Sequence, residues 1–219
     1  MGFALGKLLF KGEGRASAQL PEDLRQELEA WRESPAPALD APHFHTRYVV
    51  VDVATAGQGG GARQLTGIAA LGMKAGSIVA SDAFAADFTE QSTVDRQLLA
   101  FLKYAGKAPL VTYHAPFVSS FLEQACKKRL DIDFQPQWID LTWLLPSLFK
   151  EVSETPLPLD VWLERFGLAA GGRRDTMANT LMLGRLFQML VARATSLEVL
   201  NAAMLVEESE SAAFLRRNH

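Results

Sequence analysis

The 219-residue chain has little cysteine, no excess of positive charge and no long hydrophobic run, and each absence excludes a class of protein. Cys126 is the only cysteine, so no disulfide can form within the chain, and we expect a buried thiol in a reducing, cytoplasmic compartment. The formal net charge of -3 gives no broad cationic field, so any contact with nucleic acid has to rest on local basic clusters. Lys7 and Lys11 interrupt the apolar N-terminal stretch, and no apolar run approaches membrane-spanning length, so we expect no membrane association.

Hydrophobic residues make up 48% of the chain, which is enough to bury the core of one domain with an appendage. The pattern divides the chain into three parts: an N-terminal arm over 1–46, a folded domain over 47–194 and a C-terminal helix over 195–219. The arm carries a short amphipathic helix over 20–31 and a proline-rich linker. The C-terminal helix is expected to begin at a capping box, in which Glu198 reaches back to the amide of Thr195.

The periodicity of the central part is typical of an α/β domain. Four segments have the composition of strands: 47–53, 65–73, 77–84 and 109–113. Five segments have the spacing of helices: 93–104, 116–129, 140–149, 157–166 and 176–194. The first strand is a continuous β-branched run, which indicates burial on both faces and a central position in the sheet. The order of strand, helix and strand predicts a mixed central β-sheet flanked by helices.

The most informative segment is 48–57, in which a strand leads into the lone carboxylate of Asp52 and a turn at Gly57. It has the frame of a D-x-E-T-x-G metal site, but Ala54 stands where the second carboxylate belongs. Two divalent cations held close together repel each other unless several negative ligands offset their charge. The segment therefore predicts the scaffold of a metal site that has lost a ligand.

Three later segments complete a pattern: Leu-Val-Thr-Tyr-His-Ala-Pro-Phe-Val at 110–118, Trp-Ile-Asp-Leu-Thr at 138–142 and Arg-Asp-Thr-Met-Ala-Asn-Thr-Leu at 174–181. Together with 48–57, they resemble the motifs of the DEDD 3'-5' exonuclease family of the DEDDh type, which includes the proofreading epsilon subunit of bacterial DNA polymerase III and RNase T. The resemblance covers 47–194 and implies an RNase H-like fold. It also implies a single-stranded nucleic-acid 3' end, of DNA or RNA, as the ancestral ligand.

The departures from this family lie at the positions that carry its chemistry. In the family, four carboxylates hold two divalent cations and a histidine activates the attacking water. Here only Asp52 matches; Ala54, Val118 and Asn179 stand at the other carboxylate positions, and Arg174 stands at the histidine position. Arginine stays protonated and cannot act as a general base. The resemblance thus implies a degenerate pseudo-exonuclease without metal-dependent hydrolysis or cofactor, which acts in nucleic-acid binding or as an interaction module.

In an alternative interpretation, the protein retains some exonuclease activity. Asp175 lies one helical turn before Asn179, so Asp175 and Asp52 could hold a single Mg²⁺ or Mn²⁺ ion in an active or weakly active exonuclease. The competing interpretation is that Asp175 caps the helix that begins at Thr176, and we expect the cap.

Four residues are candidate nucleic-acid contacts: Thr55, His114, Arg173 and Arg174. The two arginines follow a glycine turn and could clamp a phosphate. We expect His114 to be a hydrogen-bonded residue of a strand-to-helix junction rather than a catalytic histidine, and Asp140 to cap its own helix. We expect His43 and His45 to be solvated in the linker.

Both terminal helices carry apolar stripes. Leu24 and Leu28 share one face of the first helix, and Leu200 and Met204 share one face of the last. These stripes predict either a homodimer or protein contact, or packing against the chain's own domain.

Overall fold

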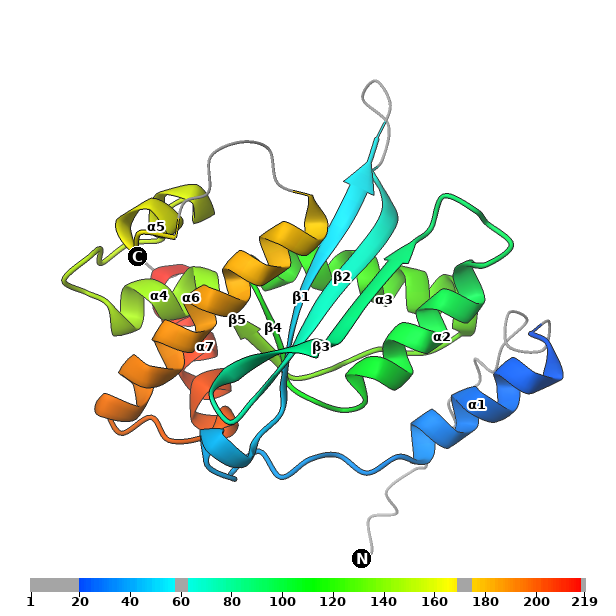
Figure 1. Cartoon of the computed structure of the whole chain (residues 1–219), viewed down its shortest axis with the longest axis horizontal. Helices are drawn as coiled ribbons and strands as arrows, with labels where there is room; N and C mark the ends of the chain where they lie inside the picture. The colour runs from blue at the N-terminus through cyan, green and yellow to red at the C-terminus, as the bar shows by residue number, and fades with distance from the viewer. Residues whose placement is uncertain (1–19, 58–62, 169–174, 218–219) are drawn as a thin grey trace, which may run out of the picture.

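The computed structural model describes residues 20–57, 63–168 and 175–217. A five-stranded sheet with the order β3-β2-β1-β4-β5 lies at its centre (Figure 1). The strands are β1 (Tyr48–Ala56), β2 (Gln64–Lys74), β3 (Ser77–Asp87), β4 (Leu110–Thr112) and β5 (Trp138–Asp140). β1, β2 and β3 are antiparallel, whereas β4 is parallel to both β1 and β5. The predicted mixed sheet is confirmed, with β5 as a strand that the sequence patterns did not predict.

Helices cover both faces of this sheet (Figure 1). The α-helices are α1 (Glu22–Glu33), α2 (Val94–Ala105), α3 (Ala115–Leu130), α4 (Leu141–Leu148), α5 (Leu159–Arg165), α6 (Thr176–Ser196) and α7 (Ala202–Arg217), and a 3-10 turn spans His43–His45. Within the described residues, no helix is both long and apolar enough to cross a membrane.

Alternation along β1 divides the interior into two cores. Val49, Val51 and Val53 point to one face and join the apolar residues of α1, α2 and α3. Tyr48 and Val50 point to the other face and join those of α4, α5, α6 and α7. Because both faces are covered, the three valines at 49–51 are all 0% exposed, as predicted for a central strand.

The N-terminal helix packs on the chain's own domain. Leu24, Leu28 and Trp31 belong to the same core cluster as α2 and α3, and the Trp31 indole donates to the Gly106 carbonyl at 3.2 Å. Exposed ion pairs from Arg96 to Asp23 and from Lys103 to Glu27 join α2 to α1. The apolar stripe of this helix is therefore buried within the molecule.

The predicted capping box at 195–198 is wrong. α6 continues to Ser196, and the Thr195 hydroxyl donates to the Val191 carbonyl at 2.9 Å as an interior helical residue. Glu198 has a positive φ of 63° and lies in the turn that follows. α7 begins at Ala202, where the Asn201 side chain accepts from the Met204 amide at 3.0 Å. A Thr-x-x-Glu pattern cannot show whether a helix is starting there or ending there.

His43 is not a solvated linker residue, which corrects the prediction. Its side chain is only 6% exposed; Nδ1 lies 2.6 Å from the Tyr48 hydroxyl oxygen and Nε2 lies 3.0 Å from the Val199 carbonyl oxygen. A carbonyl can only accept, so Nε2 carries the proton and Nδ1 accepts from Tyr48. Burial lowers the pKa of His43. His45 is exposed, as expected.

Acid is expected to destabilise the protein through His43. Its folded-state pKa lies below its unfolded value of about 6.5, so between these two values the unfolded chain binds more protons than the folded chain. The stabilisation is complete above about pH 6.5 and is lost as the pH falls below it. Urea unfolding between pH 7.5 and 5 should show a smaller loss in His43→Gln than in the parent protein. Equal losses in the two proteins would contradict this assignment.

Candidate functional site

Asp52 lies on the face of β1 that α6 covers. It pairs with Ala69 of β2 and shares the orientation of Tyr48 and Val50. Its carboxylate accepts the Val53 amide at 2.9 Å and is hydrogen-bonded by the Asn179 side chain of α6. Burial raises the pKa of Asp52, and these two hydrogen bonds only partly oppose that effect. The structure thus brings together two of the predicted site residues, Asp52 and Asn179, as a carboxylate with a neutral amide partner.

Asp175 caps α6, as expected. The helix begins at Thr176, and the exposed Asp175 carboxylate accepts the Ala178 amide at 2.7 Å. A carboxylate at this place also suits the positive end of the helix dipole.

A shallow hollow of about 300 Å³ lies between the sheet and the start of α6, where Ala54, Asp87 and Asp175 line it. Ala54 pairs with Gly67 of β2, and Gly67 in turn pairs with Asp87 of β3. Directly opposed residues of antiparallel strands face the same side, so Asp87 lies on the α6 face two strands from Ala54, about 10 Å away by strand spacing. A methyl group in place of hydrogen at Gly67 would lie 2.9 Å from the Ala86 carbonyl oxygen, so the hollow's floor requires glycine.

The sequence patterns missed Asp87 because they ended the third strand at Phe84. The available signal was Asp-Phe-Thr at 87–89, a spacing at which an aspartate side chain closes a local turn. In the structure, the Asp87 carboxylate accepts the Thr89 amide at 2.8 Å, and hydrogen bonds from Thr89 lower the pKa of Asp87.

Val118 lies in the other core. Its side chain is 1% exposed and packs in the cluster formed by α1, α2 and α3, whereas Asp52 faces α6. Thr55 is half-buried and directly follows an irregularity in the pairing of β1 with β2. Arg173 and Arg174 lie outside the described residues.

These side chains do not form the ligand set of a two-cation centre. Across 20–57, 63–168 and 175–217, no three side chains of His, Cys, Asp or Glu are grouped so that they could hold a metal ion. Ala54 and Val118 offer only hydrocarbon, and Asn179 offers a neutral amide, which is a weaker ligand for a hard cation than a carboxylate. The described part of the site can bind by hydrogen bonds and contact, but its donor set does not fit two divalent cations.

A strained junction lies between β4 and α3. His114 has left-handed backbone angles, φ 64° and ψ 63°, which are uncommon for a residue other than glycine. Its amide lies 2.9 Å from the Asp140 Oδ1 and 2.8 Å from the Thr142 hydroxyl, so two acceptors share its hydrogen. Asp140 also accepts the Thr142 amide at 2.9 Å and caps α4. Both predictions, a hydrogen-bonded junction at His114 and a cap at Asp140, are confirmed.

Three aromatic side chains follow one another from this junction along α3, and we call them the aromatic strip: His114, Phe117 and Phe121. The ring centroids are 6.3 Å apart between His114 and Phe117 and 5.0 Å apart between Phe117 and Phe121. His114 is exposed and the two phenylalanines are half-buried. Because β1 and β4 are parallel, the strip begins at the same edge of the sheet at which β1 ends. Spacing at i, i+3 and i+7 was the sequence signal for it.

The basic cluster that ends α3 has structural partners. Lys127 lies 3.2 Å from both Asp131 and Asp133, and Arg129 pairs with Asp95. Basic residues also suit the negative end of the helix dipole. This cluster therefore stabilises the end of α3 in the free protein.

Comparison with known proteins supports the fold. No family model matches the sequence, and no curated protein matches it. The nuclease domain of 3'hExo, a DEDDh family member bound to rAMP, superposes with a TM-score of 0.52 and 14% identity over 69% of this chain and 94% of that one. E. coli Exonuclease I in complex with a dT13 oligonucleotide superposes with a TM-score of 0.49 and 11% identity, over 70% of this chain and 42% of that one. Exonuclease X in complex with 5' overhanging duplex DNA superposes with a TM-score of 0.46 and 13% identity, over 74% of this chain and 99% of that one. The chain has the RNase H-like exonuclease fold.

Proposed function

We propose that this protein is a pseudo-exonuclease that binds a nucleic-acid 3' end without metal-dependent hydrolysis. The observation that carries the proposal is the state of Asp52, which is a single half-buried carboxylate hydrogen-bonded to the neutral Asn179. Ala54 and Val118 support the proposal because their hydrocarbon side chains cannot bind a metal ion. The order of the motifs favours a relative of the epsilon subunit and RNase T, and the buried thiol of Cys126 is consistent with a cytoplasmic location.

The chemistry explains why binding can persist without hydrolysis. In-line attack on a phosphodiester needs positive charge beside the phosphate oxygens, which two cations supply, and an activated water, which a general base supplies. Asp52 supplies at most one negative charge, and Asn179 contributes none, so the pair cannot offset the charge of two divalent cations. Contacts with bases and phosphates require neither a metal ion nor a general base.

The aromatic strip offers the base-binding part of such a site. Aromatic faces stack with any base and contribute about 1–3 kcal/mol per base. The nuclease domain of 3'hExo was solved with rAMP bound, which supports a nucleotide as the ligand class. We propose Arg173, Arg174 and Thr55 as the phosphate contacts, since a guanidinium group binds phosphate oxygens in pairs.

An assay for strand shortening tests the absence of hydrolysis. The purified full chain, incubated with Mg²⁺ or Mn²⁺ and 5'-labelled single-stranded DNA or RNA, is expected to leave both substrates at full length. Asp52→Ala serves as the control for a contaminating nuclease. Shortening by the parent protein that Asp52→Ala abolishes would overturn the proposal.

Binding is expected to depend on the aromatic strip. Phe121→Leu keeps an apolar side chain but removes the aromatic face, and should weaken binding of a labelled oligonucleotide by about five- to tenfold in fluorescence anisotropy with EDTA present. Phe44→Leu is the matched control, because Phe44 is 66% exposed and lies outside the strip. Equal affinities of the two variants would exclude the strip as the base-binding surface.

A weakly active single-cation exonuclease is the second candidate. It is favoured by one observation: Asp87 and Asp175 line the same hollow beside Ala54. Calorimetric titration with Mn²⁺ distinguishes the two candidates. A single site that Asp52→Asn or Asp175→Asn removes would support this candidate, and the absence of binding heat at millimolar Mn²⁺ would exclude it.

Protein contact through the terminal helices is a separate proposal. The apolar stripe of α1 is buried within its own chain, but α7 exposes Phe214 and Leu215. A homodimer or a partner would therefore use α7.

A further inference from the structure

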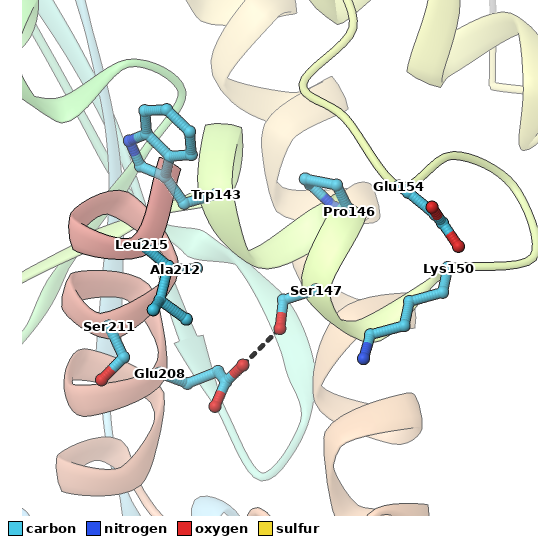
Figure 2. A pocket seen from close by; sticks show the side chains of 9 residues that line it. All are labelled: Trp143, Pro146, Ser147, Lys150, Glu154, Glu208, Ser211, Ala212 and Leu215. Carbon is cyan, nitrogen blue, oxygen red and sulfur yellow. Dashed lines mark hydrogen bonds between the residues drawn. The ribbon is translucent and has the colours of Figure 1, made fainter. Parts of the chain in front are cut away.

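A groove of about 660 Å³ lies between α4 and α7, and it shares no lining residue with the hollow beside Ala54. Figure 2 shows its lining, with Trp143 and Pro146 of α4 and with Ala212 and Leu215 of α7. Leu215 is 59% exposed and Phe214, in an adjoining hollow, is 67% exposed. Large apolar side chains with this exposure, next to each other on one helix, mark a surface that another segment can cover.

Carboxylates surround this apolar lining. Glu154 and Glu208 line the groove itself, and Glu210 lines the adjoining hollow. Glu208 also accepts a hydrogen bond from the Ser147 hydroxyl, which joins α7 to α4 across the groove (Figure 2). Lys150 is the basic residue among the groove's lining. The groove therefore favours an occupant that combines apolar side chains with positive charge.

Residues 1–19 of the same chain have this composition. Their large apolar residues are Phe3, Leu5, Leu8, Leu9 and Phe10, and their charged residues are Lys7, Lys11, Glu13 and Arg15. Three basic residues against one acidic residue give the segment the sign opposite to that of the groove's glutamates. Lys7 and Lys11 flank the apolar run over 8–10, so apolar and basic groups can contact one surface together.

The length of this segment is sufficient. Nineteen residues span up to about 60 Å when extended. A domain of 219 residues has a radius of gyration of about 17 Å, and Gly6, 14 residues before Leu20, has about 48 Å of extended chain, so the first residues of the segment can cross the molecule.

We propose that residues 1–19 occupy the α4–α7 groove of their own molecule, with phenylalanine and leucine side chains against Trp143 and Leu215 and basic side chains near Glu154 and Glu208. The segment would then compete with a homodimer or a partner for the apolar face of α7. This inference is independent of the proposed function, because it uses neither Asp52 nor the aromatic strip.

Disulfide trapping in the full chain tests this inference. Gly6→Cys is combined with Ser211→Cys in the groove or, as the matched control, with Ser81→Cys on β3; both serines are exposed. The native Cys126 is 0% exposed and does not compete. We expect the variant with Gly6→Cys and Ser211→Cys to form an intramolecular disulfide at least about tenfold faster than the control variant, since a bound segment has a higher local concentration at its site.

Charge reversal supplies the second arm. Adding Lys7→Glu and Lys11→Glu to the groove pair is expected to slow trapping by about fivefold, because the segment then carries the same charge as the groove, and to leave the control pair unchanged. Equal rates for the groove and control pairs would overturn the proposal. Disulfide-linked dimers as the main product in dilute protein would also overturn it, because they would show that the segment of a second copy takes the groove.

Discussion

Val118→Asp is expected to destabilise the protein by about 3–5 kcal/mol, although the motif resemblance predicts aspartate at this position. Val118 is 1% exposed and packs among the apolar residues of α1, α2 and α3. A carboxylate placed there would be removed from water among apolar side chains. Either it stays charged and unpaired or its pKa rises until it is protonated, and both outcomes lower the free energy of unfolding. Urea unfolding followed by circular dichroism at pH 7 measures the loss.

Two companion variants separate charge from shape. Val118→Asn has a similar shape without the charge and should be less destabilising at pH 7, and the difference from Val118→Asp should shrink as the pH falls and the carboxyl is protonated. Asn179→Asp instead places a second carboxylate next to the half-buried Asp52, and is expected to be less destabilising than Val118→Asp. If Val118→Asp were as stable as the parent, position 118 would have to face the solvent, and the division of the two cores at β1 would be wrong.

Asp140→Ala is expected to destabilise the protein by about 2–4 kcal/mol. The Oδ1 atom of Asp140 lies 2.9 Å from both the His114 amide and the Thr142 amide, and the residue is only 5% exposed. Removing this acceptor uncaps α4 and weakens the contact that holds the left-handed turn at His114. Urea unfolding measures the loss. Oligonucleotide binding should fall as well, because the aromatic strip begins at that turn.

Asp140→Asn is the matched control. Its amide oxygen can accept both hydrogen bonds, so the free energy of unfolding should stay within about 1 kcal/mol of the parent value. Comparable losses in Asp140→Ala and Asp140→Asn would show that the negative charge, rather than the shared acceptor atom, stabilises the junction.

The fold was largely predictable because its signals are local. The valine run at 49–51 indicates a strand buried on both faces wherever it lies in the chain, and the structure places it at the centre of the sheet. β5 escaped prediction because its three residues run directly into α4, and the helical pattern over 140–149 begins at its last residue, Asp140. The end of α6 and the start of α7 were misplaced because Thr195 and Glu198 have the same spacing in a starting helix and in an ending one.

The candidate site was predictable only in part. Asp52 and Asn179 could be paired from their positions in the motifs, and Asp175 could be recognised as a cap from its place before Thr176. Asp87 joins the hollow only because two successive strand pairings place it in line with Gly67 and Ala54. The aromatic strip is oriented by Asp140, which lies 26 residues from His114.

By itself, the sequence determined the mixed sheet, the central position of β1 and the absence of carboxylates at positions 54, 118 and 179. The tertiary structure alone decided that Asp52 and Val118 lie on opposite sides of the sheet, that Asp87 lines the same hollow as Ala54, and that His43 is buried. The physical reason is the range of the contacts. Strand and helix patterns depend on neighbours a few residues apart, whereas the burial of His43 depends on a carbonyl at Val199, 156 residues away.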